Sequence, residues 1–135
     1  MKYIRNVVVL VILASTALQV SAETVVIVSA KNPATRMFSE QASQFFLGKS
    51  NLFTPIDQAD GTAIRNEFYL KLADKDPAQV KAHWSKLVFT GKAQPPKEYR
   101  SNAEVRKAVS EDPKAIGYID RSAVDESVKI ILSLP

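Results

Sequence analysis

P-I-D-Q-A-D-G-T-A-I-R-N-E-F-Y, residues Pro55–Tyr69, is the stretch of sequence on which our interpretation of the fold depends. A short apolar segment, Leu52–Ile56, leads into a polar turn at Asp57–Gly61. Large apolar residues then recur at every fourth position over Ile64–Leu72, which is the spacing of an amphipathic helix. The stretch therefore predicts a strand, a turn and a helix in direct succession.

The predicted turn is also the candidate binding site. Asp60 stands where the N-cap of the helix is expected, and Gly61 allows the backbone to approach a ligand closely. The hydroxyl of Thr62 would join the first free N–H groups of the helix. Unpaired donors and the positive end of the helix dipole coincide at such a terminus, which suits an oxyanion. The simpler alternative is that Asp-Gly-Thr only caps the helix.

The N-terminal residues have the three parts of a secretory signal peptide. Lys2 and Arg5 precede an apolar run, Val7–Leu18, and small residues lead up to a cleavage position after Ala22. The apolar run is shorter than the roughly 20 residues that a membrane-spanning helix needs. We therefore expect a signal peptide over residues 1–22, a single domain over residues 23–135, and a soluble periplasmic protein after export.

The composition excludes several classes of function. Removal of Lys2 and Arg5 takes Lys and Arg from 18 to 16 against 14 Asp and Glu, so the net charge falls to +2. That charge is too small and too evenly spread to indicate a nucleic-acid partner. The chain has no cysteine and one histidine, so it offers no thiol nucleophile, disulfide or Ser-His-Asp set. We expect a protein that is not an enzyme and that has no metal and no cofactor.

The N-terminal half predicts a compact parallel unit. Glu23–Ser29 contains four consecutive Val and Ile residues without alternation, which is typical of a strand buried on both faces in a parallel sheet. A helix is expected to begin with Ser39 as its N-cap and to end at Gly48 in the left-handed conformation. The next strand, Leu52–Ile56, would complete a parallel strand–helix–strand unit.

The C-terminal half predicts two more helices and two more strands. Asp76 and Pro77 mark the start of a helix, and Trp84 lies at the centre of its apolar stripe, which also includes Val80, Leu87 and Val88. Pro95-Pro96 allows neither a helix nor the hydrogen-bond ladder of a strand. A capping box at Ser101–Glu104 begins the last helix. The strands are expected at Ile116–Ile119 and Val128–Leu132. Together the elements predict a three-layer α/β domain, in which helices cover both faces of a small, mostly parallel sheet.

Several segments in this order resemble the substrate-binding proteins of phosphate ABC transporters, in particular their short, single-domain relatives. They are Phe45–Lys49, Asp60–Thr62, Phe68–Leu72, Val80–Lys92, Gln94–Lys97 and Ala115–Asp120. The resemblance covers nearly all of the chain after the signal peptide. It implies one lobe of a type II periplasmic binding protein, whereas full-length members close two such lobes over phosphate.

The resemblance also implies which residues would contact the anion. Gly61 and Thr62 match the Gly and Thr of a Ser-Gly-Thr turn, and Asp60 stands in the position of the Ser. Asp57 falls near the position where the family commonly has an arginine that faces phosphate. An anion in place of that cation opposes phosphate binding, so the change Asp57→Arg is expected to tighten it.

Two hypotheses for the function follow. The first is an exported solute-binding-like domain that binds phosphate or another oxyanion through Asp60, Gly61 and Thr62, with Asp57 opposing, and that works with a membrane transporter. The alternative is a periplasmic protein-interaction module that has lost phosphate binding. The loss of the arginine and of the second lobe favours the alternative.

Overall fold

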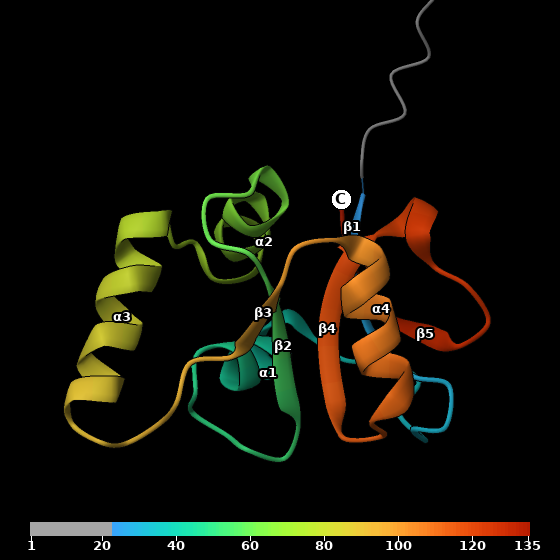
Figure 1. Ribbon diagram of the computed structural model, residues 1–135, viewed down its shortest axis with the longest axis horizontal. Helices are drawn as coiled ribbons and strands as arrows, with labels where there is room; N and C mark the ends of the chain where they lie inside the picture. Colours follow the sequence, from blue (N-terminus) through green and yellow to red (C-terminus); the bar gives the residue numbers. More distant parts are fainter. Residues whose placement is uncertain (1–22) are drawn as a thin grey trace, which may run out of the picture.

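The computed structural model describes residues 23–135, and the predicted signal peptide lies outside these residues. Figure 1 shows the elements in chain order. They are β1 (Thr24–Ser29), α1 (Ser39–Phe46), β2 (Thr54–Gln58), α2 (Ala63–Ala73), α3 (Pro77–Phe89), β3 (Lys97–Tyr99), α4 (Asn102–Glu111), β4 (Ala115–Asp120), the short 3₁₀ helix η1 (Arg121–Ala123) and β5 (Val128–Leu134).

The five strands form one sheet in the order β3-β2-β4-β1-β5. Strand β2 pairs in parallel with both β3 and β4, whereas β1 pairs antiparallel with both β4 and β5. Four strands therefore run in one direction and β1 runs against them, so the mostly parallel sheet is confirmed. The predicted parallel unit of β1, α1 and β2 is wrong, because β4 separates the two strands and they run in opposite directions.

Strand β1 is nevertheless buried on both faces, as its sequence predicts. Val26 and Val28 belong to an apolar cluster with residues of α1, α2 and α3, whereas Val25 and Ile27 belong to a second cluster with residues of α4. Helices thus cover both faces of the sheet, as Figure 1 shows. This arrangement confirms the three-layer α/β architecture.

Two helix ends follow their local sequence closely. Asp76 is the N-cap of α3 and accepts a 2.8 Å hydrogen bond from the backbone N–H of Gln79, with Pro77 in the first turn. Gly48, just after α1, has a φ of +73°, as predicted for a glycine that ends a helix. The N-cap of α1 is Phe38 rather than Ser39, and the Gln41 side chain accepts a hydrogen bond from the Phe38 amide.

Strand β2 differs from its predicted position, and strand β3 was not predicted. Strand β2 begins at Thr54, two residues later than expected, and Leu52 remains 75% exposed. It extends to Gln58, so Asp57 lies within the strand rather than in the turn. The short edge strand β3 follows Pro96 directly and was not predicted. A strand of three residues next to two prolines is too short to show a recognisable pattern.

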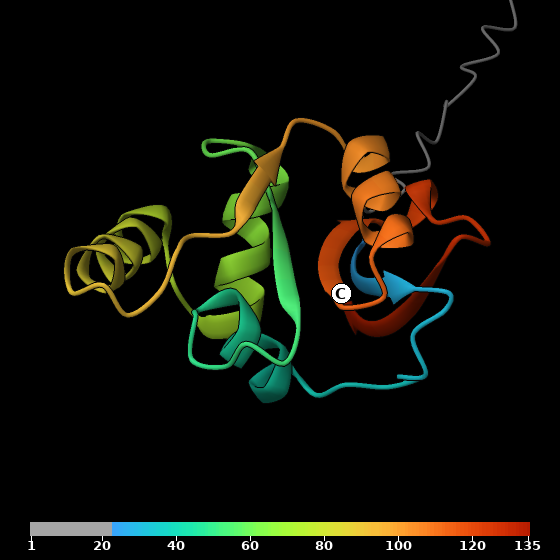
Figure 2. The same ribbon diagram turned by 60° about the horizontal axis from the view of Figure 1, so that its bottom comes forward.

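Helix α3 lies at the outer end of the molecule, beyond α2 and β3, in both Figure 1 and Figure 2. Trp84 is 7% exposed and packs against Gly48, and His83 Nε2 lies 2.7 Å from the carbonyl oxygen of Leu47. These contacts attach α3 to the end of α1. Because only one side of α3 is covered, Val88 is 45% exposed, and the expectation that it faces inward is wrong.

Candidate functional site

The predicted site turn joins β2 to α2, but the cap residue differs from the prediction. Thr62, not Asp60, is the N-cap of α2, and its hydroxyl donates a 2.8 Å hydrogen bond to the carbonyl of Ala59. Asp60 is exposed, and its amide donates a 3.0 Å hydrogen bond to Glu98 Oε1. Gly61 has a φ of +81°, which a residue with a side chain rarely adopts.

Helix α2 begins without a side-chain cap. The hydroxyl of Thr62 bonds back into the turn. No side chain among residues 23–135 caps the first-turn amides, and the first turn contains no acidic residue. A Cβ built on Gly61 would meet no atom within 4 Å, so the space above the turn is open. Amides at an uncapped helix start, beside open space, are the arrangement that favours an anion.

Asp57 lies inside the protein, at the end of β2. Its side chain accepts hydrogen bonds from the hydroxyl of Tyr69 at 2.6 Å, from the hydroxyl of Tyr118, and from the backbone amide of Gln58 at 2.9 Å. The residue is 1% exposed. The expectation that Asp57 belongs to a solvent-facing turn is therefore wrong, because three donors from three different positions enclose its carboxylate.

Burial changes the acid–base properties of this cluster. Removal from water raises the pKa of Asp57 above its usual value, although nearby Arg65 and the hydrogen bonds from Tyr118 and Tyr69 act in the opposite direction. Burial and the neighbouring Asp57 also raise the pKa of both phenols. The two tyrosines therefore remain protonated at neutral pH and keep donating to the carboxylate.

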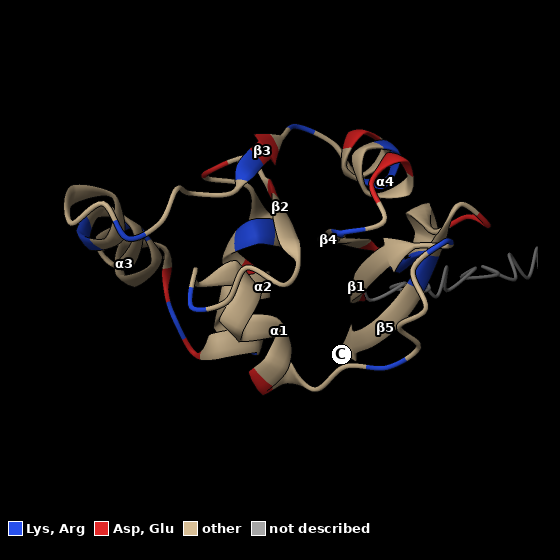
Figure 3. Ribbon diagram, turned by 90° about the horizontal axis from the view of Figure 1, so that it is seen from below, with Lys and Arg blue, Asp and Glu red and all other residues tan. Residues whose placement is uncertain are grey.

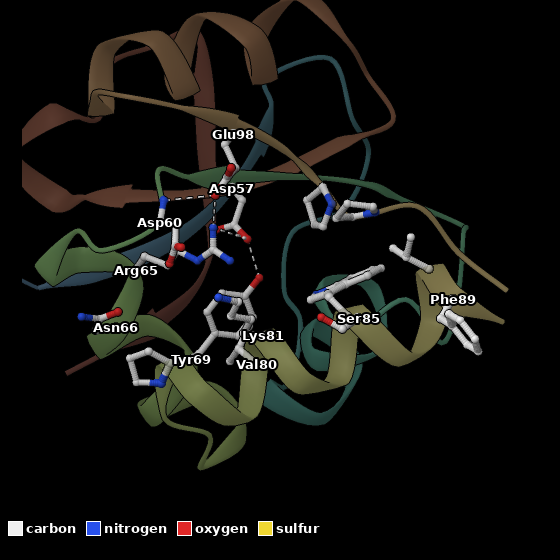
Figure 4. A pocket seen from close by; sticks show the side chains of 15 residues that line it. Asp57, Asp60, Arg65, Asn66, Tyr69, Val80, Lys81, Ser85, Phe89 and Glu98 are labelled. Carbon is white, nitrogen blue, oxygen red and sulfur yellow. Dashed lines mark hydrogen bonds and ion pairs between the residues drawn. The ribbon is translucent and has the colours of Figure 1, made fainter. Parts of the chain in front are cut away.

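Arg65 is the functional candidate that our sequence analysis missed. Its guanidinium donates to the carbonyl of Gln58 at 3.2 Å. It also contacts Glu98 and lies 3.9 Å from Oδ2 of Asp57, as the close view in Figure 4 shows. It also lies over the ring of Tyr69, 5.7 Å from the centroid. Arg65 and Tyr69 are four residues apart on one helix, and this spacing places them on one face. That spacing was the available signal.

A groove runs along the side of α2 and between α2, α3 and the segment before β3 (Figure 4). Its volume is about 570 Å³. Its lining includes Asp57, Asp60 and Arg65 at the β2–α2 side and Trp84 and Phe89 on α3. Gly61 and Thr62 are not in the lining. The structure therefore separates the predicted anion turn from the groove, and only Asp60 borders both.

The candidate site has more negative than positive charge. The lining of the groove has three carboxylates, Asp57, Asp60 and Glu98, against two cations, Arg65 and Lys81, and Arg65 contacts both Asp57 and Glu98. Elsewhere the charges are mixed, and Figure 3 shows basic and acidic segments interspersed over α4 and the neighbouring part of β3. Within residues 23–135, no group of three or more His, Cys, Asp or Glu side chains is placed to hold a metal ion.

Three solved structures share this fold. They are a phosphate ABC transporter substrate-binding protein from Clostridium perfringens with bound phosphate (TM-score 0.64, 19% identity), an ABC-type phosphate transport receptor from Vibrio cholerae (0.62, 18%) and PstS from Borrelia burgdorferi (0.62, 16%). The match covers 82% of this chain in each case and 44%, 45% and 46% of those chains, respectively.

The comparison defines the fold as that of one lobe of phosphate-transport binding proteins. The chain spans less than half the length of each of the three structures. No protein-family model and no curated protein sequence matches it. In the part of the chain that the structure describes, no helix is both long enough and apolar enough to cross a bilayer.

Proposed function

We propose that this protein is an exported solute-binding domain that binds phosphate, or a closely related oxyanion, at the start of α2. The donors are the amide of Gly61, the first-turn amides of the helix, and the hydroxyl of Thr62 when it turns away from Ala59. Asp60 accepts the proton that hydrogen phosphate carries. The observation that supports this most directly is the uncapped start of α2 beside an open turn, within a fold shared with phosphate-binding proteins.

The charges predict that this binding is weak. Asp60 and Glu98 are exposed carboxylates close to the turn, and Arg65, the nearest guanidinium, already contacts Glu98. A dianion therefore meets net repulsion, which a second lobe or a partner protein would have to offset. We expect dissociation constants in the millimolar range, which correspond to roughly 4 kcal/mol of binding free energy.

A phosphate titration of the purified protein by calorimetry, with sulfate as the matched anion, tests the proposal. Phosphate should bind more tightly than sulfate, because Asp60 accepts a proton from hydrogen phosphate and repels an anion that has none to donate. Asp60→Asn should bring the two affinities together. Equal affinities for phosphate and sulfate in the unmodified protein would contradict the role of Asp60.

Two glycine variants separate the site from general backbone strain. Gly61→Val should abolish phosphate binding, because its side chain fills the space above the turn. Gly91→Val is the control, since Gly91 also has a positive φ, +69°, and open space around it. Both variants have the same kind of strain, and only Gly61→Val should affect binding. Loss of binding in both would show that strain alone is responsible.

A second candidate function is a periplasmic protein-interaction module that has lost phosphate binding. The buried cluster around Asp57 favours it, because no arginine occupies that position and Arg65 is paired with Glu98. A phosphate binder gains thermal stability as RT ln(1 + [L]/Kd), whereas the interaction module does not respond to phosphate. A melting temperature that is the same in about 100 mM phosphate as in chloride of equal ionic strength would put this second function first.

Export to the periplasm is part of the proposal. The signal sequence over residues 1–22 predicts cleavage after Ala22, and N-terminal sequencing of the periplasmic protein should begin at Glu23. Retention of Met1 in the membrane fraction would mean that Val7–Leu18 anchors the protein. A contact with an ABC transporter permease is likewise a proposal, which cross-linking in membranes would test.

A further inference from the structure

We propose that the groove between α2, α3 and the segment before β3 binds an extended peptide that carries a Lys or Arg side chain close to apolar side chains. This site shares only Asp60 with the proposed oxyanion turn, since neither Gly61 nor Thr62 lines the groove. The proposal rests on the different chemistry of the two ends of the groove, which a single ligand has to match.

One end of the groove is acidic. Asp57 and Asp60 come from the end of β2 and the turn after it, and Glu98 comes from β3. The cations of the lining are Arg65, which is already bonded to Glu98 and to the backbone of Gln58, and Lys81 of α3. Asp57 is buried, but the side chain of Glu98 is 46% exposed and Asp60 is exposed. Two accessible carboxylates therefore favour a positively charged group.

The other end is apolar and mostly uncovered. Phe89 is 93% exposed and Val88 is 45% exposed, and both lie at the C-terminal end of α3. Pro95 and Pro96 form the opposite wall. Large apolar side chains that gather at the edge of a groove are typical of a surface that binds another molecule. Lys81 lies on the α3 wall beside Tyr69 (Figure 4), and the three carboxylates of the lining all come from the β2–β3 side.

Two features favour a peptide over a small organic cation. Phe89 lies at the end of α3, away from the acidic residues (Figure 4), so an occupant that contacts both ends of the groove has to be extended. In addition, the indole Nε1–H of Trp84, which lines the groove, has no hydrogen-bond partner among residues 23–135. A peptide carbonyl would supply the missing acceptor after a small movement of the indole.

The test uses synthetic octapeptides with blocked ends and no tryptophan. Each contains one Arg and a Leu-Phe pair, and the separation between them increases through the set. A second set replaces the Arg by Glu, and a third replaces the Leu-Phe pair by two Ser residues. Binding to the purified protein is measured by calorimetry. The fluorescence of Trp84, the only tryptophan, reports whether the peptide occupies the groove.

We expect at least one separation in the Arg set to bind about tenfold more tightly than its Glu counterpart, and the Ser set to bind weakly. Phe89→Ser should weaken the best peptide about fivefold or more, because exposed aromatic anchors dominate such interfaces. Leu52→Ser is the matched control, since Leu52 is 75% exposed but does not line the groove. Glu98→Gln should reduce the preference for Arg over Glu.

Three results would overturn the proposal. The first is that no separation in the Arg set binds more tightly than its Glu counterpart. The second is that Phe89→Ser and Leu52→Ser weaken binding equally, which would indicate non-specific contact. The third is that the protein binds phosphatidylcholine vesicles through Phe89 and binds no peptide, which would assign the apolar end to a lipid surface. None of these outcomes depends on whether phosphate binds at the α2 turn.

Discussion

The hydroxyl of Tyr69 donates a 2.6 Å hydrogen bond to Oδ2 of Asp57, and this contact ties the middle of α2 to the end of β2. Tyr118 of β4 donates to the other carboxylate oxygen, and its ring is stacked on Phe68 at 3.6 Å. Three elements therefore meet at one buried carboxylate. Asp57 is a structural centre next to the candidate site rather than an accessible ligand.

Replacing Asp57 by Asn should destabilise the protein. The amide has one acceptor oxygen in place of two, so one of the two phenols loses its partner. A buried donor without a partner costs about 1–3 kcal/mol, and chemical denaturation should show a loss of that size. The exposed Asp60→Asn is the control and should change stability by less than about 0.5 kcal/mol. Equal stability of the two variants would contradict the role of the cluster.

The same cluster predicts that Asp57→Arg does not fold. The resemblance to phosphate-binding proteins implied that this change would tighten phosphate binding, because it places Asp57 opposite the anion. The side chain is 1% exposed, so an arginine there would place an uncompensated charge among Tyr69, Tyr118 and the sheet. Circular dichroism of the variant should show an unfolded chain. A folded Asp57→Arg variant would mean that the cluster can open to water.

Stability should depend on pH through Asp57. Burial raises the pKa of Asp57 in the folded protein above the value of about 3.9 in an unfolded chain. The folded state then holds the proton more tightly, so this contribution is complete below about pH 4 and decreases as the pH rises through the folded pKa. The unfolding free energy of the unmodified protein relative to Asp57→Asn should fall over that range in urea titrations. A relative stability that rises with pH would contradict the shift.

Arg65 should contribute more to stability than an ordinary surface cation. It bonds to the Gln58 carbonyl and to Glu98 and lies near buried Asp57, whereas Lys71 only pairs with Glu67 one turn away on α2. Arg65→Gln should cost about 1–3 kcal/mol, and Lys71→Gln about 0.5 kcal/mol or less. Thermal or urea unfolding of both variants gives the comparison. Equal losses would show that Arg65 acts only as a surface charge.

Replacing Gly48 by Ala should destabilise the protein, because the added side chain would collide with Trp84. An added Cβ at Gly48 would lie 2.7 Å from Trp84 Cη2, and the φ of +73° adds strain. Gly91 has a φ of +69° and open space, so Gly91→Ala measures the strain alone. Gly48→Ala should therefore cost about 1–3 kcal/mol more than Gly91→Ala. Equal losses would mean that the indole moves aside freely.

Removing the indole of Trp84 should lower the free energy of unfolding substantially. Trp84 is 7% exposed and attaches α3 to the rest of the protein. Trp84→Ala should lose roughly 3–5 kcal/mol, whereas Trp84→Phe should lose less, because it keeps most of the ring and removes an N–H that lacks a partner. The native emission should be that of a tryptophan shielded from water. Emission typical of full exposure would contradict this packing.

Local chemistry made part of the fold predictable. Asp76 and Pro77 start α3 because their effects act within one turn, and Gly48 ends α1 for the same reason. The direction of β1 could not be predicted, because an unbroken apolar run does not specify which strands pair with it. Its partners β4 and β5 lie near the other end of the chain.

The candidate site was predicted less well than the fold. Asp57 was assigned to a polar turn because the residues that follow it, Gln58 to Gly61, are mostly polar. Its burial depends on hydroxyl donors from Tyr69 and Tyr118, and Tyr118 is distant in sequence. Such a cluster can be recognised only when the arrangement of the strands in the sheet is known. Arg65 was missed for a similar reason, since its partner Glu98 belongs to the unpredicted strand β3.

The position of β1 has a consequence for how the chain folds. Val25 pairs with Ile119 on one side and with Ser133 on the other, so the first strand of the domain to be synthesised has its hydrogen-bonding partners among the last. Contacts between such distant positions form slowly, because a long loop has to close before they stabilise anything. The nascent chain therefore cannot complete its sheet until synthesis has reached β5.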